Sequence, residues 1–330
     1  MKTSLVTGGA GFIGSHVCQE LINQGHKVVV LDDLSGGFKD NVPNEAEFCE
    51  GSILDNSLLS ILFEKHSIDY VFHLAAYAAE GLSHFIKRFN YENNLIGSVN
   101  LINLSILHNV KCFVFTSSIA VYGNGQAPLD EKTAPSPEDP YGIAKLAVEQ
   151  ELKVSEEMFD LPYIVFRPHN VYGEKQNIGD KYRNVVGIFM NQIMQDLPMT
   201  IFGDGKQQRA FSHISDVAPI IANSIDIPKA FGEVFNIGSD TPHTLNELSR
   251  EVASVFGIES PQIKYLEARN EALEAYADHS KIRKLMNIGP AMPLKEGLTK
   301  FANWARNHGP RKSKDFGNIE VRKCLPPSWL

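Results

Sequence analysis

Tyr141 and Lys145 are residue types that together can remove a proton from a hydroxyl group. They are four positions apart, so on a helix their side chains share one face. A phenol has a pKa of about 10, and a nearby ammonium favours the phenolate, which is the better general base. Ser118 follows the end of an apolar segment and could hydrogen-bond the same hydroxyl. We therefore expect these three residues to act together, although the Tyr–Lys spacing by itself also arises by coincidence on a surface.

A glycine-rich turn near the start of the chain has the spacing of a dinucleotide-binding loop. Gly9, Gly11 and Gly14 fit G-x-G-x-x-G, and Gly8 with the last two fits a shifted G-x-x-G-x-x-G. The turn follows an apolar segment that ends at Thr7, and it precedes a helical pattern of apolar residues, namely Phe12, Ile13, Val17 and Leu21. Glycines permit a tight turn and close approach to a pyrophosphate, to which the helix N-terminus offers free N–H groups. The turn therefore predicts a bound dinucleotide.

Asp32 ends a second apolar segment, 27–32, and lies 18 residues after Gly14. In dinucleotide-binding folds a carboxylate at this place binds the ribose hydroxyls of the adenosine. The same carboxylate would repel a 2′-phosphate, and no arginine follows within the next few residues. The expected cofactor is therefore NAD and not NADP.

Strand and helix patterns alternate through the first half of the chain. We expect strands at 3–7, 27–32, 46–50, 69–74, 111–117 and 162–167, and helices near 12–24, 56–65, 84–108 and 141–158. Runs such as 70–76 and 112–115 are apolar throughout, as in central parallel strands that are covered on both faces. The alternation predicts an α/β fold with a doubly wound, Rossmann-like parallel sheet.

The pattern becomes mixed beyond residue 168, with short strands at 200–202 and 233–237 among helices and loops. We therefore expect residues 1–168 to form the NAD-binding domain, to which later segments return. Residues 169–330 would form a smaller mixed region that mainly binds the substrate. The tail from Gly309, which contains Lys, Arg and a Pro-Pro pair, is expected to run over the surface.

Composition excludes several classes of function. The 330 residues carry a net charge of −8 and a pI of about 5.8, which gives no support for binding nucleic acid or an anionic membrane. No apolar run approaches the about 18 residues of a membrane span, and the chain opens directly on a strand pattern without a signal peptide. The four cysteines have no metal-ligand spacing. We expect a cytoplasmic protein without a metal.

The chain resembles the extended short-chain dehydrogenase/reductases, and within them the nucleotide-sugar epimerase/dehydratase group, UDP-glucose 4-epimerases above all. The resemblance covers nearly the whole chain. It rests on Thr7 to Gly14, Asp32, 73–76, 94–97, Ser118 with 121–123, 141–145, 167–173 and 202–205 with Arg209.

The resemblance implies a role for each motif. The catalytic set would be Ser118, Tyr141 and Lys145. The NAD-binding residues would be Gly8, Gly11, Phe12, Ile13, Gly14, Asp32, Ser52, Ile53, Ala75, Ala76, Asn94, Ser117, Tyr141 and Lys145. A UDP-sugar would be bound by Ser118, Asn170, Arg209 and Arg269, the last three at its diphosphate.

The sequence also departs from the pattern of this group. Ser52 stands where an aspartate is common in the adenine pocket, and Ala272 stands where an acid often pairs with a phosphate-binding arginine. The segment 77–84 differs from common epimerases, which leaves its substrate contacts open. In 4,6-dehydratases an Asp–Glu pair follows the active-site hydroxyl residue, whereas this chain has Ile119 and Ala120, which transfer no protons. A dehydratase is therefore disfavoured.

The simplest reaction that fits is 4-epimerisation of a UDP-sugar of the UDP-glucose/UDP-galactose type through a 4-keto intermediate. A UDP-uronic acid epimerase or decarboxylase would use the same catalytic set. A 4-keto sugar reductase would exchange NADPH, which Asp32 argues against, and a catalytically silent dinucleotide sensor would need no base. The resemblance also suggests a homodimer that pairs the helices 84–108 and 141–158. Their apolar faces comprise Leu95, Val99, Leu101, Leu104, Leu146, Val148 and Leu152.

Overall fold

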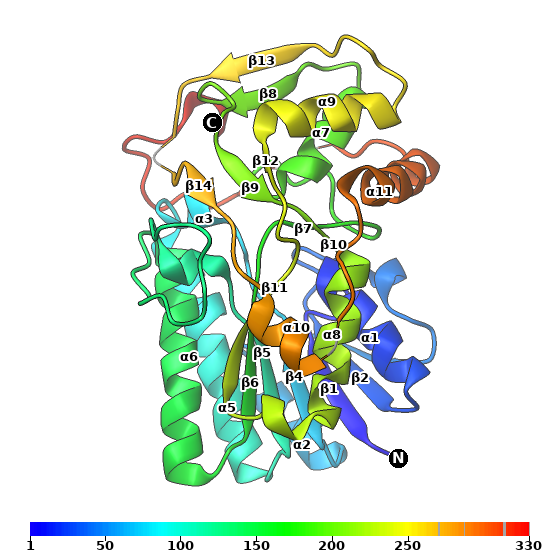
Figure 1. Ribbon diagram of the computed structural model, residues 1–330. Helices are drawn as coiled ribbons and strands as arrows, with labels where there is room; N and C mark the ends of the chain where they lie inside the picture. The colour runs from blue at the N-terminus through cyan, green and yellow to red at the C-terminus, as the bar shows by residue number, and fades with distance from the viewer. Residues whose placement is uncertain (270, 287, 313–314, 330) are drawn as a thin grey trace.

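A parallel sheet forms the centre of the computed structural model, which describes residues 1–269, 271–286, 288–312 and 315–329 (Figure 1). Its seven strands have the order β11-β6-β5-β4-β1-β2-β3, and all neighbours are parallel. Their bounds are β1 Thr3–Thr7, β2 Lys27–Asp32, β3 Glu47–Glu50, β4 Tyr70–His73, β5 Cys112–Thr116, β6 Tyr163–Pro168 and β11 Glu233–Ile237. The order reverses between β1 and β4, and ligands of such sheets bind at the carboxyl ends beside this point.

Both faces of the sheet are apolar and covered by helices. Leu5 points to one face and its neighbour Val6 to the other, and both are fully buried, in two separate clusters. The first face packs on α2 Asn56–Lys65, α5 Gly97–Leu107 and α6 Pro140–Phe159, and the second on α1 Phe12–Asn23, α8 Ala218–Asn223 and α10 Ser280–Met286. The predicted doubly wound α/β fold is confirmed.

The single helix expected over 84–108 is interrupted. The chain forms the short helices α3 Glu80–Ser83 and α4 Lys87–Tyr91 and then a π-helical turn, Glu92–Ile96, before α5 begins. Asn94, in the π-helical turn, donates to Asn90 Oδ1 at 2.8 Å and also bonds the backbone of a loop. Apolar periodicity does not predict such a turn, because the bonds that Asn94 forms here involve polar side chains and backbone.

The strand β11 completes the main sheet from a distant part of the sequence. It pairs with β6 along its whole length, with Phe235 beside Phe166. The sequence predicts a strand here and later segments that return to the first domain, but the strand is expected among the elements of the mixed region. Its partner could not be read from its own residues, because an apolar strand fits any covered edge.

The second region lies over the carboxyl ends of the sheet (Figure 1). Its helices are α7 Val185–Ile193, α9 Leu245–Val255 and α11 Leu294–His308. Its strands are β7 Val171–Tyr172, β8 Met199–Phe202, β9 Gln208–Ala210, β10 Ser212–His213, β12 Pro242–Thr244, β13 Ile263–Leu266 and β14 Glu274–Ala275. The three helices and β8 enclose a third core that contains Phe189, Ile201, Leu248 and Phe301. No helix within the described ranges has the length and apolar character that a membrane crossing requires.

The sequence predicts that the C-terminal tail runs over the surface. In the structure, part of the tail is buried instead. Leu325 and Trp329 are only 8% and 4% exposed. They join an apolar cluster with Leu82, Ile86 and Tyr182, and so cover the α3–α4 segment. The Lys and Arg content of the tail conceals these apolar anchors.

Candidate active site

A cavity of about 1210 Å³ opens between the carboxyl ends of the sheet and the second region. This exceeds the about 300–1,000 Å³ of a typical single-ligand pocket. Most of the site residues predicted from the sequence line it: Gly8, Gly11, Phe12, Ile13, Gly14, Asp32, Ile53, Ala75, Ala76, Ser117, Ser118, Tyr141, Lys145, Asn170, Arg209 and Arg269. The fold thus gathers segments from both halves of the chain around one space. Ser52 and Asn94 are not among the lining residues.

The glycine turn has no room for side chains. A Cβ on Gly14 would lie 2.1 Å from the carbonyl oxygen of Gly8, and one on Gly8 would lie 2.7 Å from the backbone nitrogen of Ala75. Gly8 also has a φ of +72°, which side chains disfavour. Helix α1 begins directly after Gly11, which supplies no side-chain cap, so its first N–H groups remain free for a ligand. This cradle fits the pyrophosphate of a dinucleotide.

Asp32 lies at the end of β2, beside the glycine turn. Its Oδ2 accepts from the Ala10 N–H at 3.0 Å and its Oδ1 from the Leu34 N–H at 2.8 Å. Burial raises the pKa of this carboxyl, against the effect of these donors. Each carboxylate oxygen can accept a further hydrogen bond. Asp32 is therefore held in place and can still accept from the ribose hydroxyls of NAD.

Asn94 supports the cavity from outside. Its Oδ1 accepts from the Tyr77 N–H at 2.9 Å, and its Nδ2 donates to the Tyr77 carbonyl at 3.1 Å. These bonds hold the loop that carries Ala75 and Ala76, which line the cavity. In the structure Asn94 thus contacts this loop, and its contact with the cofactor stays a prediction.

Two of the predicted serines use their hydroxyls within the protein. Ser52 Oγ accepts from the Leu54 N–H at 3.2 Å, while its neighbour Ile53 faces the cavity. Ser117 donates its hydroxyl to Glu149, which also forms a buried ion pair with Arg167.

The catalytic residues meet where β5 ends and α6 begins. Asp139 caps α6 by accepting from the Gly142 N–H at 2.9 Å, which places Tyr141 and Lys145 in the first two turns. Lys145 Nζ donates to the carbonyl of Thr116, the last residue of β5, at 2.8 Å. Two residues later Ser118 opens a 3₁₀ turn, Ile119–Tyr122, and accepts from the Ala120 N–H at 3.1 Å. The structure thus brings Ser118, Tyr141 and Lys145 together around the same cavity.

Burial has the largest effect on the pKa values of Tyr141 and Lys145. Tyr141 and Lys145 are 5% and 2% exposed, and the ammonium lies 5.8 Å from the centre of the phenol ring. Burial lowers the pKa of Lys145 to about 7, although Glu149 acts in the opposite direction. Burial, and then the Glu80 carboxylate, raise the pKa of Tyr141, while the Ser118 hydroxyl lowers it. Burial thus raises the pKa of the phenol, which is opposite to the lowering expected from the nearby ammonium.

Glu80 is a site residue that the sequence analysis did not identify. It begins α3 and is exposed to the cavity, whose walls surround its carboxyl group. This enclosure and the Asp139 carboxylate raise the pKa of Glu80 to about 7. The only signal in the sequence is an acid in the unusual segment after Ala76. Glu80 and Asp139 together make the surroundings of Tyr141 acidic.

Arg209 is held by a loop of the second region. Its Nη2 donates to Glu271 Oε2 at 3.2 Å and to the Ala272 carbonyl at 2.7 Å. The acid that the sequence lacks at Ala272 is thus supplied one position earlier. Asn170 also lines the cavity, and its left-handed φ of 41° is supported by a bond from its Nδ2 to the Ala210 carbonyl.

Arg269 is held by aromatic rings. Its guanidinium carbon lies 3.2 Å from the ring centre of Phe202 and 4.7 Å from that of Trp329. Its Nε is buried and has no hydrogen-bond partner among the described residues. Burial lowers the pKa of Arg269 to about 10, which still leaves it charged at neutral pH. Arg209 and Arg269 therefore offer an anion site in the same cavity as the proton-transfer residues.

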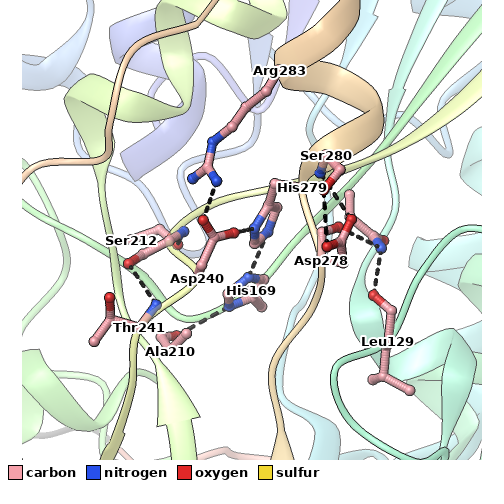
Figure 2. Close-up of polar contacts among 12 residues, drawn as sticks. Leu129, His169, Ala210, Ser212, Asp240, Thr241, Asp278, His279, Ser280 and Arg283 are labelled. Carbon is pink, nitrogen blue, oxygen red and sulfur yellow. Dashed lines mark hydrogen bonds and ion pairs between the residues drawn. The ribbon is translucent and has the colours of Figure 1, made fainter.

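A chain of polar contacts runs from the Ala210 carbonyl through the buried His169 and His279 to Asp240 and Arg283 (Figure 2). His169 Nδ1 faces the Ala210 carbonyl at 3.1 Å and must donate to it, so its Nε2 accepts from His279 Nε2 at 3.0 Å. His279 Nδ1 lies 2.5 Å from Asp240 Oδ1, and Arg283 bonds the other oxygen. Burial and the neighbouring His279 lower the pKa of His169 to about 3.

The family model described as the NAD-dependent epimerase/dehydratase family matches residues 4–238. This range includes the glycine turn, Asp32, the catalytic residues, Asn170 and Arg209. The match agrees with the fit of the glycine cradle and Asp32 to NAD.

Relatives of known or assigned activity match almost the whole chain. A putative UDP-glucose 4-epimerase of Methanocaldococcus jannaschii is 32% identical over 92% of this chain and 98% of its own length. The crystal structure of a Thermotoga maritima UDP-glucose 4-epimerase with UDP-glucose is 35% identical, with a TM-score of 0.88 over 93% of this chain and 99% of that one. A UDP-glucuronic acid 4-epimerase from Bacillus cereus, solved with UDP-glucuronic acid and NAD, is 29% identical, with a TM-score of 0.84 over 93% and 99%.

Proposed function

Because this chain belongs to the NAD-dependent epimerase/dehydratase family, we propose that it is a 4-epimerase of a neutral UDP-sugar of the UDP-glucose/UDP-galactose type. One observation carries the proposal. A single cavity contains a hydroxyl-deprotonating set, a cradle for NAD and two arginines for a diphosphate. The activities named for the relatives support the same reaction.

The residues of the chain divide the work of the reaction. Tyr141, as phenolate, takes the proton of the sugar 4-hydroxyl and later returns it, while Ser118 hydrogen-bonds the same oxygen. The glycine turn and Asp32 would hold NAD, which would supply the hydride chemistry at carbon 4. Arg209 and Arg269 hold the diphosphate by charge while the 4-keto sugar turns its other face.

The residues after Ser118 favour epimerisation over dehydration. Ala120 lines the cavity and Ile119 is nearly buried, and neither side chain can accept or donate a proton. The site therefore has no acid–base pair at the place where dehydratases carry one.

The acidic surroundings of Tyr141 favour a neutral sugar over a uronic acid. Glu80 and Asp139 both line the cavity, and both influence the pKa of the Tyr141 phenol. Arg183 lies at the same end of the cavity, but it is paired with the nearly buried Asp180 at 2.7 Å, more closely than Arg209 is with the exposed Glu271 at 3.2 Å. A uronate would bring a further negative charge beside two carboxyl groups, which Coulomb repulsion disfavours.

We place the reaction in the cytoplasm. All four cysteines, Cys18, Cys49, Cys112 and Cys324, are free thiols, as is usual in a reducing compartment.

A panel of nucleotide sugars tests the proposal. Purified protein is incubated with UDP-glucose, UDP-galactose, their N-acetylated forms, UDP-glucuronate and the dTDP-hexoses, and the products are separated by chromatography. We expect interconversion of a neutral UDP pair and no CO₂ from UDP-glucuronate. Preferred turnover of UDP-glucuronate, or a 4-keto-6-deoxy product, would contradict the proposal.

A further inference from the structure

The tail after α11 is fixed to the body of the protein at separate points. Arg311 and Asn191, on α7, exchange two bonds: the Arg311 N–H donates to Oδ1 at 2.8 Å, and Asn191 Nδ2 donates to the Arg311 carbonyl at 2.9 Å. Further along, the Glu320 carboxylate accepts from the backbone N–H groups of Arg88 and Phe89 at 2.8 and 2.9 Å. The tail, red in Figure 1, thus links the second region to α4.

The last described residues of the tail form part of the cavity wall. The segment 324–329 lines the cavity, and Trp329 is 4% exposed. The Trp329 ring packs edge-on against Phe85 and Tyr182, with ring centres 6.1 and 5.4 Å apart. A Cβ on Gly81 would lie 3.1 Å from this ring, so the absence of a side chain at Gly81 makes room for it. Trp329 therefore occupies a fitted place next to α3.

Trp329 and Phe202 both contact the guanidinium of Arg269, whose carbon is 4.7 and 3.2 Å from the two ring centres. Rings hold a cation through their faces and leave its N–H groups in the guanidinium plane free. The buried Nε of Arg269 has no hydrogen-bond partner in the part of the chain that the structure describes, so the rings orient this cation and leave its Nε–H available. An anion is the ligand that such a group lacks.

We propose that Trp329 is a positioning residue of the substrate site, through which the C-terminal tail fixes Arg269 for the diphosphate of a nucleotide sugar. This inference rests on the proposed function. The tail is then a working part of the binding site, which would be incomplete in a chain that ends before it.

Tryptophan fluorescence can observe this contact directly, because the chain has only two tryptophans, Trp304 and Trp329. Trp304 lies on α11, where it stacks on His308 at 4.2 Å, and does not line the cavity. In a Trp304→Phe protein all tryptophan emission comes from Trp329. We expect UDP to change this emission saturably, and the reverse variant, Trp329→Phe, to show a much smaller change from Trp304.

Kinetic and binding measurements then distinguish a role of Trp329 in positioning Arg269 from a role in packing alone. Trp329→Ala should raise the KM for the UDP-sugar and the Kd for UDP by about three- to thirtyfold, the range of a partly desolvated cation–π contact. The kcat and the NAD content should change little, and Trp329→Phe, which retains a ring face, should restore most of the affinity. Trp304→Phe removes the same residue type outside the cavity and should leave both constants unchanged.

The outcomes distinguish this inference from the proposed function. If calorimetry finds no UDP binding to the unaltered protein, the proposed function fails, and this inference fails with it. If UDP binds but leaves Trp329 emission in the Trp304→Phe protein unchanged, only this inference is overturned. The emission measurement leaves Trp329 in place, so it decides the question even if Trp329→Ala fails to fold.

Discussion

Tyr141 depends on its neighbours for the charge state that the reaction needs. Burial and the Glu80 carboxylate disfavour the phenolate, and Ser118 favours it. Lys145 also reaches back to the Thr116 carbonyl, so it ties the start of α6 to the end of β5. The three residues are thus expected to contribute unequally.

Changing Tyr141 to Phe should lower turnover by about 10²–10⁴-fold, the usual contribution of a general acid–base group. The ring and the NAD content remain, because only the hydroxyl is lost. Lys145→Met should cost as much and also lower the NAD content, while Ser118→Ala removes one hydrogen bond and should be milder. Steady-state kinetics on folded, NAD-loaded protein measures this, and a loss of less than about threefold for Tyr141→Phe would exclude Tyr141 as the base.

Changing Glu80 to Gln should shift the pH dependence of kcat/KM. The carboxylate raises the pKa of Tyr141, so its removal should move the rising limb of the profile to lower pH. Glu259→Gln, which neutralises an exposed carboxylate outside the cavity, is the matched control and should leave the limb in place. An unchanged limb in the Glu80 variant would show that the two groups do not interact in the working enzyme.

Among the elements, α5 and α6 carry apolar side chains on two different faces. Leu101, Val148 and Leu152, which the sequence analysis assigned to a dimer interface, are fully buried against the sheet. The exposed apolar residues of this part of the chain are Ile96, Leu107, Ile143, Val154, Met158 and Phe159, of which Leu107 is 73% and Met158 70% exposed. We still propose a homodimer that pairs these helices, but through this outer set.

Met158→Lys combined with Val154→Glu should therefore produce a monomer, because charges would replace the apolar contact. Light scattering should then give about half the mass of the unaltered dimer. Ile61→Glu places a charge at an exposed apolar position on α2 and should leave the dimer intact. An unaltered protein that is already monomeric at micromolar concentration would refute the dimer.

The glycine turn should determine retention of the cofactor. We expect the purified protein to release NAD, and not NADP, when it is denatured. Gly14→Ala should abolish this release, since the added Cβ would lie 2.1 Å from the Gly8 carbonyl oxygen and force the turn open. Gly317→Ala, where a Cβ meets nothing within 4 Å, is the control. Chromatography of the released nucleotide gives the result, and full NAD content in Gly14→Ala would contradict the assigned cradle.

The sequence predicts elements better than it predicts their partners. Strands β1 to β6 and helix α6 lie within one or two residues of their expected bounds, because continuous apolar runs and the Asp-Pro cap are local signals. The sequence does not predict the π-helical turn at Asn94 or the roles of Glu80 and Trp329. Each depends on a contact with residues distant in the sequence, and no local pattern specifies such a contact.

For the molecule as a whole, buried neutral histidines should set the response to acid. His73 lies between Thr7 Oγ1 and Ser98 Oγ at 2.7 and 2.8 Å, and burial lowers its pKa to about 3, as it does that of His169. These groups stay neutral in the folded state while the unfolded chain takes up protons below about pH 6.5. Their contribution to stability is therefore present at neutral pH and is lost as pH falls from about 6.5 toward 3.

Each such histidine should make the free energy of unfolding fall by about 1.4 kcal/mol per pH unit within that window. Urea unfolding between pH 7 and pH 4.5 measures the slope. Replacing His73 with Gln should lower stability at pH 7 but flatten the slope, whereas replacing the exposed His308 should change neither. A slope that His73→Gln leaves unchanged would show that this histidine is already protonated in the folded protein.

The placement of β11 has a consequence during synthesis on the ribosome. The edge of β6 stays unpaired until the chain has been extended from Pro168 to Ile237, since only then can β11 dock. At about 5–20 residues per second the nascent chain exposes this apolar edge for several seconds. Such an edge is a template for intermolecular pairing, so chaperones that bind emerging chains should be most needed while this stretch is translated.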